Sequence, residues 1–235
     1  MKKRITLTII SLFLANISLA APTCTATGDC AAGCYKDQTK GCTECPDNSY
    51  TTQPNQTLCT PCGSHSTSNN DKTGCTCNPG YHTAGQSQNH TENNSVACVA
   101  NTYKITYNQN GAPAHPIPIG QEVQYNGNFT TKSSDTFKYP GHHFTHWEYN
   151  GKEFDPNTEY LYNYTTDIIL LAQWSECPAG YYCPDGAAET KCPAGATSDA
   201  GADDITKCYM SGDTQICDQD GCIYLPTGTK IHAKQ

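Results

Sequence analysis

The sequence predicts a small β-rich protein of several modules, in which a compact β domain lies between two disulfide-rich, loop-dominated modules. Sixteen cysteines occur among the 235 residues, yet none falls between Cys98 and Cys177. Only that segment has aromatic and β-branched runs able to bury an ordinary hydrophobic core. The 19 glycines and 14 prolines argue further against one large core. We therefore expect cysteine-rich modules at residues 24–98 and 175–235, and a central domain at 101–174.

Residues 1–20 are typical of a secretory signal peptide. Lys2-Lys3-Arg4 is the charged start, and Ile5–Leu14 is an apolar run too short to span a membrane. Ser18-Leu19-Ala20 provides small residues before a cleavage site that we place after Ala20. No later stretch is apolar and long enough for a membrane span. We expect a secreted, extracellular or cell-surface protein, with the periplasm as an alternative.

The charge balance argues against nucleic acid as a partner. Loss of Lys2, Lys3 and Arg4 with the signal peptide would leave 11 basic and 22 acidic residues, a net charge of −11. Arg4 is the only arginine, so the processed chain would have no guanidinium group to clamp a phosphate. Affinity for nucleic acid depends largely on basic contacts to phosphate.

In an exported chain, cysteines are expected to form disulfides. Ten lie in the first cysteine module and six in the second, so each module can close its own bridges. The sequence leaves the connectivity open, since six cysteines already allow fifteen pairings. The disulfide candidates are Cys24, Cys30, Cys34, Cys42, Cys45, Cys59, Cys62, Cys75, Cys77, Cys98, Cys177, Cys183, Cys192, Cys208, Cys217 and Cys222.

The first cysteine module contains a loose internal repeat. Close cysteine pairs at Cys42/Cys45, Cys59/Cys62 and Cys75/Cys77 are each followed by turn residues, at intervals of about 16 to 23 residues. This pattern resembles the ephrin-receptor-like and growth-factor-receptor-like cysteine modules of extracellular proteins. The resemblance covers Cys42 to Cys98 and implies an elongated ladder of small bridged loops.

Two other interpretations of these cysteines remain open. Cys42, Cys45, Cys59 and Cys62 have the spacing C-x2-C-x13-C-x2-C, which is close to that of a zinc ribbon. Cys59-Thr-Pro-Cys62 could also be a redox motif, although the residues that follow lack the helical period that lowers the thiol pKa in such enzymes. The zinc site is our alternative to disulfides.

Strand patterns dominate the central domain. Tyr103–Tyr107 alternates apolar and polar residues, and a second short strand is expected at Glu122–Tyr125. Phe144–Tyr149, the Asn150-Gly151 turn and Lys152–Phe154 predict a hairpin. In the closing run, Ile168, Leu170, Ala172 and Trp174 share one face.

These segments together resemble the internalin-type B repeat. The matching stretches are YKITYNQNG at 103–111, YPGHHFTHW at 139–147, Phe154-Asp155 and DIILLAQW at 167–174. The chain departs from the family pattern at His143, His146 and Leu171. The resemblance implies a β-grasp-like domain of a bacterial surface protein that serves as a spacer or in adhesion. It implies core positions at Tyr107, Phe144, Trp147, Leu170 and Trp174, with Trp147 as a ligand-stacking surface in the alternative.

Three histidines in this domain raise the question of a metal site. On a helix, His142 and His146 would share a face, but the Pro140-Gly141 break and the alternating pattern favour a strand. Four residues of strand span roughly 13 Å, too far for one ion. We expect ordinary surface or half-buried histidines.

The second cysteine module contains Cys-Pro-Ala-Gly twice, at Cys177 and Cys192. It resembles the ephrin-receptor-like module more clearly, and each copy is expected to form a tight turn. Cys217–Cys222 is typical of a hairpin whose ends could be bridged. Asp218 and Asp220 have the spacing of calcium-loop ligands, but Thr229 occupies the position of the closing acid, so we favour a turn.

We find no nucleophile-and-base motif or phosphate loop, and we predict no enzyme and no cofactor. The expected function is that of a non-enzymatic, exported bacterial interaction protein, binding an unknown protein or glycan at a cell surface. The alternative is a zinc-binding protein that uses the C-x2-C pairs. Five N-glycosylation sequons, which we attribute to chance in a bacterial chain, begin at Asn55, Asn89, Asn93, Asn128 and Asn163.

Overall fold

A computed structural model describes residues 23–25, 28–92, 96–113, 119–133, 138–184, 186, 188–210, 215–218, 221–224 and 230–232. The predicted signal peptide at 1–20 lies outside these residues. The chain divides into two compact units, Met1–Val99 and Ala100–Gln235, which we call the N-terminal and C-terminal units. The described residues contain no helix whose length and hydropathy would allow it to cross a membrane.

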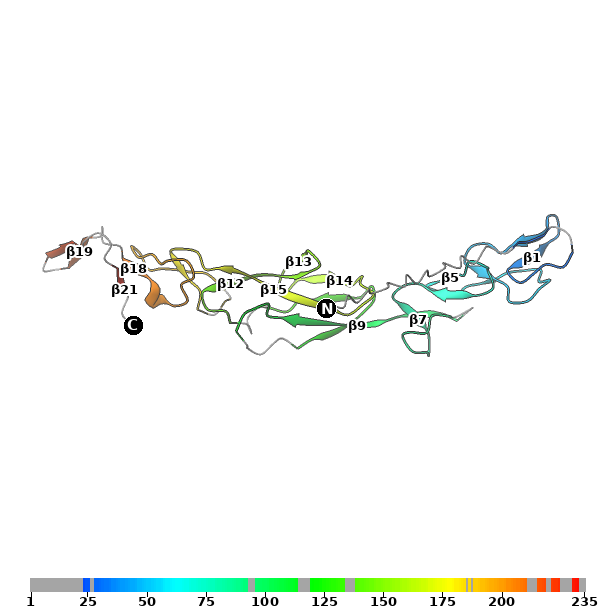
Figure 1. Cartoon of the computed structure of the whole chain (residues 1–235), viewed down its shortest axis with the longest axis horizontal. Coiled ribbons are helices and arrows are strands. Elements are labelled where there is room, and N and C mark those ends of the chain that lie inside the picture. Colours follow the sequence, from blue (N-terminus) through cyan, green and yellow to red (C-terminus); the bar gives the residue numbers. More distant parts are fainter. Residues whose placement is uncertain are drawn as a thin grey trace, which may run out of the picture. The chain divides into compact units, whose positions relative to one another are not determined.

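Short strands that pair two by two build the N-terminal unit (Figure 1). The pairs are β1–β2, β3–β4, β5–β6 and β7–β8. The bounds are β1 (Cys34–Asp37), β2 (Gly41–Glu44), β3 (Ser49–Tyr50), β4 (Thr60–Pro61), β5 (Ser66–Ser68), β6 (Cys75–Cys77), β7 (Tyr81–Thr83) and β8 (Cys98–Ala100). Strands this short bury little apolar surface, so other forces must hold the unit together.

One turn recurs in both cysteine modules. Each copy starts at a cysteine, and the third residue after it has a positive φ. These residues include Gly33 (85°), Asn48 (58°), His65 (55°), Gly80 (86°), Gly180 (86°) and Gly195 (81°). Glycine and, to a lesser degree, asparagine and histidine tolerate this left-handed region, which explains why Cys-Pro-Ala-Gly and Cys-Pro-Asp-Asn form the same turn.

The turns are linked to one another through the backbone. In three cases the carbonyl of the positive-φ residue accepts a hydrogen bond from the cysteine that opens the next turn. The bonds run from Cys45 N to Gly33 O (3.0 Å), from Cys62 N to Asn48 O (2.8 Å) and from Cys192 N to Gly180 O (2.9 Å). Successive turns therefore satisfy each other's polar backbone groups without a helix or a large sheet.

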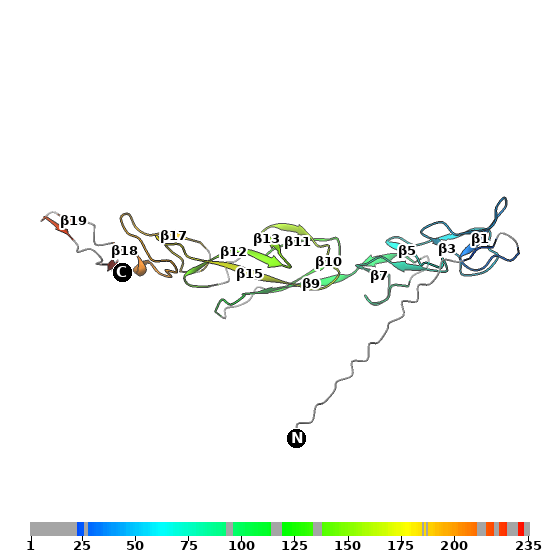
Figure 2. The ribbon, with the colours of Figure 1, turned by 45° about the horizontal axis from the view of Figure 1, so that its top comes forward.

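The central domain is a mixed five-stranded sheet with the order β10-β9-β15-β12-β13 (Figure 2). β9 and β15 run parallel in its middle, and the outer pairings are antiparallel. Its strands are β9 (Thr102–Asn108), β10 (Gln121–Gln124), β12 (His142–Tyr149), β13 (Lys152–Phe154) and β15 (Ile168–Glu176). The first strand of this sheet, β9, and the last, β15, lie side by side and run parallel, and each pairs on its other side with an antiparallel strand, β10 or β12. This is the strand order of a β-grasp sheet. The predicted fold class is thereby confirmed.

A small second sheet accompanies the large one. β11 (Asn128–Thr130) pairs antiparallel with β14 (Glu159–Leu161), and the sequence patterns did not predict either strand. Each has three residues and only one side chain, Phe129 or Tyr160, that packs on the core, so no alternation was visible. The buried core consists of Ile105, Tyr107, Val123, Phe129, Phe144, Trp147, Phe154, Tyr162, Ile168, Leu170 and Ala172.

A β-bulge in β12 explains how Phe144 and Trp147 both reach the same core. Phe144 and Trp147 are three residues apart, and in a regular strand they would face opposite sides. The register against β15 shifts between Phe144 and His146, which places one additional residue on β12. Both rings therefore pack inward, with centroids 5.0 Å apart.

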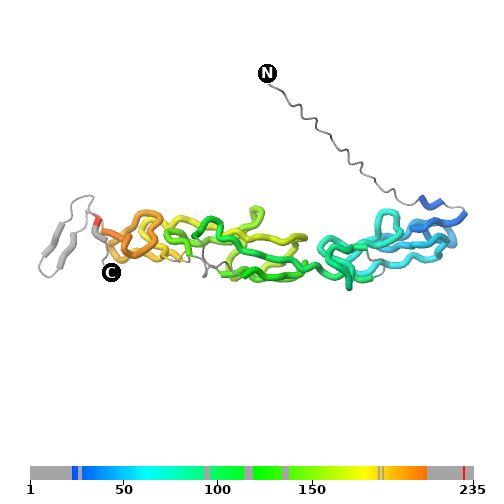
Figure 3. Tube along the Cα trace, turned by 60° about the horizontal axis from the view of Figure 1, so that its bottom comes forward, coloured from blue at the N-terminus to red at the C-terminus, as the bar shows by residue number. Residues whose placement is uncertain are grey.

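Strands and one 3₁₀ turn form the second cysteine module, which Figure 3 traces from yellow to orange after β15. The elements are β16 (Tyr181–Tyr182), β17 (Thr190–Lys191), η1 (Ile205–Lys207), β18 (Tyr209–Met210), β19 (Gln215–Asp218), β20 (Gly221–Tyr224) and β21 (Ile231–His232). β16 pairs with β17, β18 with β21 and β19 with β20. Asp204 caps η1, because its Oδ1 accepts a hydrogen bond from Thr206 N at 2.8 Å.

The central domain and the second cysteine module both belong to the compact C-terminal unit. Backbone hydrogen bonds join them across the end of the sheet. Gly141 N donates to Cys183 O (3.0 Å), Cys177 N to Gly141 O (2.8 Å) and Phe144 N to Gly186 O (2.6 Å). Because polar backbone contacts leave no trace in hydrophobic periodicity, the sequence patterns did not reveal this junction.

We expect Gly186→Ala to loosen this junction. Gly186 has φ +73°, and a Cβ there would lie 2.9 Å from Tyr139 N and 3.0 Å from Trp174 Cζ3. Gly151→Ala is the matched control, because Gly151 has φ +78° but nothing within 4 Å of its Cβ position. Both variants have a backbone cost of about 1 kcal/mol, and only Gly186→Ala adds a steric clash. Hydrogen exchange of the Phe144 amide measures the difference, and equal exchange in both variants would contradict the expectation.

Candidate functional site

The cysteines of the described side chains all form disulfides, and none of these is free. Every bond stays within its own cysteine module. The pairs are Cys24–Cys34, Cys30–Cys42, Cys45–Cys59, Cys62–Cys75, Cys77–Cys98, Cys177–Cys183 and Cys192–Cys208. Thus fourteen of the sixteen candidates have a partner. For the other two, Cys217 and Cys222, only the backbone is described.

This pairing does not fit the zinc-ribbon alternative. Cys42 is bonded to Cys30, and Cys45 is bonded to Cys59. Cys62, the fourth proposed ligand, is bonded to Cys75. Zinc ligation requires thiolates, and sulfurs in disulfides are not available for it. In each C-x2-C pair, the first cysteine instead closes one disulfide loop, and the second cysteine opens the next loop.

The redox interpretation of Cys59 and Cys62 meets the same difficulty. A dithiol oxidoreductase forms its disulfide between the two cysteines of the motif. Here they are bonded to different partners, and neither stands at the start of a helix. Both are structural cysteines of adjoining loops.

Four of the five predicted core positions of the central domain are buried, namely Tyr107, Phe144, Trp147 and Leu170. Trp174 is only half-buried, at the edge of this core, and its indole N–H donates to Gln109 O at 2.9 Å. Trp147 has an exposure of 0% and donates to Lys132 O at 2.9 Å. A completely buried ring cannot stack on a ligand, so the alternative role for Trp147 is wrong.

The three histidines of β12 have separate surroundings. His142 stacks on Tyr139 with ring centroids 3.9 Å apart. The Nδ1 atom of His143 lies 3.3 Å from a carboxylate oxygen of Glu189, whereas Nε2 of His146 lies 3.8 Å from Glu153. Within the described residues, no three His, Cys, Asp or Glu side chains converge as a metal site would require.

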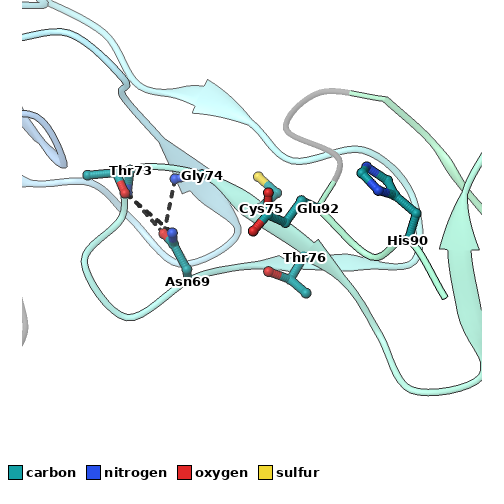
Figure 4. A pocket seen from close by; sticks show the side chains of 7 residues that line it. All are labelled: Asn69, Thr73, Gly74, Cys75, Thr76, His90 and Glu92. Carbon is teal, nitrogen blue, oxygen red and sulfur yellow. Dashed lines mark hydrogen bonds between the residues drawn. The ribbon is translucent and has the colours of Figure 1, made fainter. Parts of the chain in front are cut away.

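Two of the hollows on the N-terminal unit have volumes above 400 Å³. The first, of about 450 Å³, is polar and is lined by Asn69, Thr73, Gly74, Cys75, Thr76, His90 and Glu92 (Figure 4). Asn69 Oδ1 accepts hydrogen bonds from Thr73 N and Gly74 N, both at 3.0 Å, so this amide closes its own loop. His90 and Glu92 supply one imidazole and one carboxylate, and Thr73 and Thr76 supply hydroxyl groups.

The second hollow, of about 410 Å³, is mainly apolar. Its lining consists of Tyr35, Pro46, Asp47, Asn48, Ser49, Leu58, Cys59 and Pro61. Leu58 is 79% exposed beside these groups. No sequence pattern pointed to either hollow, because the lining residues come from separate short segments, within residues 69–92 and 35–61 respectively.

The shifted pKa values belong to structural groups. Burial raises the pKa of Tyr162, whose hydroxyl donates to Thr166 O, and it also raises the pKa of Tyr107. A hydrogen bond from Lys72 lowers the pKa of the exposed Asp47.

The described residues include four of the five sequon asparagines and one of the two aspartates with calcium-loop spacing. Asn55 Oδ1 accepts a hydrogen bond from Cys30 N at 2.9 Å, so this amide stabilises the first loops. Asn89, Asn128 and Asn163 are exposed, and the sequon at residues 93–95 lies outside the described part. Asp218 belongs to β19, and position 220 is also outside the description.

Comparison with known proteins identifies no relative: no family model, no curated protein and no solved structure matches this chain.

Proposed function

We propose that this chain is an exported, non-enzymatic interaction protein of a bacterial surface or periplasm. The cysteine modules serve as covalently braced spacers, and the β-grasp-like domain serves as the module that presents a binding surface. The partner class is a protein or a glycan at a cell surface.

One observation carries most of this proposal: the cysteines with described side chains are all used in disulfides that brace successive turns. Such bonds form and persist in oxidising compartments outside the cytosol. The aromatic residues that the B-repeat resemblance singled out are used for packing, as in a structural domain. The patterns that suggested chemistry, the C-x2-C pairs above all, have structural roles.

Peptide mapping without reduction tests the covalent part of the proposal. We expect linked peptides for the seven pairs in protein isolated from its own cells, since the bonds must form on the export route. The location is tested by mild proteolysis of intact cells followed by detection of released fragments. Free thiols in the isolated protein, or protection of the protein within the cytosol, would overturn the proposal.

The binding part requires a separate screen. Full-length, oxidised protein is presented to arrays of cell-surface glycans and to surface proteins, with the fully reduced protein as a control. A partner that binds both forms supports the β-grasp-like domain as the binding module, because the core of this domain contains no cysteine. A partner that binds the oxidised form alone would instead assign binding to the cysteine modules. Saturable turnover of a small molecule, with no such partner, would instead favour an enzyme.

A further inference from the structure

The polar hollow of the N-terminal unit is lined by residues of two short segments, 69–76 and 90–92 (Figure 4). The segments lie side by side, because Thr76 and Glu92 form an antiparallel bridge. The backbone carbonyl of Glu92 also accepts a hydrogen bond from Thr83 Oγ1 at 2.9 Å. The main chain of Glu92 is therefore held in place, whereas the residue itself is exposed at the wall of the hollow.

Two disulfides fix these segments further. Cys75, which lines the hollow, is bonded to Cys62, and the neighbouring Cys77 is bonded to Cys98. Cys77 N also donates a hydrogen bond to Thr91 O at 2.7 Å, which joins one segment to the other. A preformed site loses little conformational entropy when a ligand binds, so this bracing favours binding.

The carboxylate of Glu92 is available to a ligand. The aspartates of the N-terminal unit are all used in local hydrogen bonds from side chains, which reach Asp29 from Asn55, Asp37 from Thr39, Asp47 from Lys72 and Asp71 from Thr73. Within the described residues, the carboxylates of Glu44 and Glu92 have no such bond, and only Glu92 lines the hollow. An unpaired carboxylate at this position attracts a cationic group that can donate hydrogen bonds to it.

The charges around Glu92 limit the class of ligand. No lysine is among the lining residues, and Lys72 places its Nζ 2.7 Å from Asp47 Oδ1 and 3.2 Å from Ser68 Oγ. An anionic ligand, such as a sulfated glycan, would meet the carboxylate without a lysine to balance its charge. A metal ion would lack ligands, since no three His, Cys, Asp or Glu side chains of the described residues converge. The hollow therefore favours an organic cation.

We propose that this hollow binds an arginine side chain of a protein partner. A guanidinium can donate two parallel hydrogen bonds to the Glu92 carboxylate. Its other N–H groups have a second acceptor in the hydroxyl of Thr76, which has no hydrogen bond within the described residues. The flat imidazole of His90 offers a surface on which a guanidinium can stack. Since Arg4, the only arginine of the chain, belongs to the predicted signal peptide, the arginine comes from a different protein.

This inference goes beyond the proposed function, in which the cysteine modules act as spacers, because it assigns a binding site to one of them. The first cysteine module, at residues 24–98, has six acidic residues and three lysines. Its negative charge adds a long-range attraction for a basic partner, which raises the rate of encounter.

Two small probes test the proposal: N-acetyl-arginine amide and N-acetyl-citrulline amide, which has nearly the same shape but no charge. Each is titrated into the full-length, oxidised, isotope-labelled protein, and the shifts of its amide signals in NMR spectra give the Kd. We expect the arginine probe to shift the amides of Thr76 and Glu92 and to bind about fivefold more tightly than the citrulline probe, the upper end for a partly exposed ion pair. Equal affinities, or shifts confined to other parts of the chain, would overturn the proposal.

A pair of variants separates the site from the overall charge. Glu92→Gln keeps the shape of the side chain, and we expect it to weaken binding of the arginine probe about fivefold. Glu44→Gln is the matched control, because Glu44 is also exposed in the N-terminal unit but lies outside this hollow, and its variant should bind as the natural chain does. Neither glutamate belongs to a buried cluster of the described residues, so both variants are expected to fold.

An equal loss of affinity in both variants would show that the probe senses only net charge, and it would contradict the site. Failure of this test is distinct from failure of the proposed surface role, because disulfide mapping and proteolysis of intact cells do not depend on an arginine ligand.

Discussion

Complete reduction of the disulfides is expected to unfold the N-terminal unit while the central domain stays folded. Within the described residues of the first loops, the buried cluster consists of Cys30, Cys34 and Cys42 themselves. Five bonds in this unit, at roughly 2–4 kcal/mol each, contribute on the order of 10 kcal/mol, as much as the whole stability of a typical domain. The central domain has eleven buried core residues and no cysteine.

Hydrogen exchange with a non-thiol reductant measures this difference. Amides of β1 to β6 are expected to lose all protection after reduction, whereas those of Ile105 in β9 and Leu170 in β15 keep most of theirs. The paired variant Cys45→Ser with Cys59→Ser removes one bond of sequence separation 14 and should cost about 3 kcal/mol. Protected amides in a fully reduced N-terminal unit would show that burial, not sulfur, holds it together.

The parts of the fold that were predictable from sequence are those with a visible period. The strands predicted at 103–107, 144–149 and 168–174 alternate or end at an Asn-Gly turn, and the structure contains each of them with slightly wider bounds. The strand at 152–154, which follows an Asn-Gly turn, has the predicted bounds. β11 and β14 were missed because three-residue strands have no period. The bulge in β12 was missed because it breaks the alternation that reveals a strand.

The cysteines show a different limit of sequence reasoning. Their separation into two closed groups follows from the long cysteine-free segment. The partner of each one does not, because the spacing C-x2-C is shared by zinc sites, redox motifs and adjoining loops. Only the fold shows that Cys45 is bonded to a residue 14 positions ahead and not to Cys42, three positions behind. The junction glycines were also invisible, since their role depends on backbone approach from another module.

Trp147→Ala is expected to have the largest effect on the central domain. The side chain is completely buried, packs against Tyr107 and Phe144 with ring centroids 4.7 and 5.0 Å away, and donates a hydrogen bond to Lys132 O. Truncation of such a residue costs about 3–5 kcal/mol. The backbone carbonyl also loses its donor. A domain of ordinary stability, about 5–15 kcal/mol, would be close to unfolding.

Trp174→Ala is the matched control, because it removes the same side chain and an equivalent hydrogen bond of 2.9 Å to Gln109 O. Trp174 is half-buried at the rim of the core, so part of its surface already contacts water and the cavity left behind can fill with solvent. Urea unfolding of both variants, followed by circular dichroism, compares the two costs. If Trp174→Ala loses as much free energy of unfolding as Trp147→Ala, the centre of the core does not lie at the bulge of β12, and the packing argument for this domain fails.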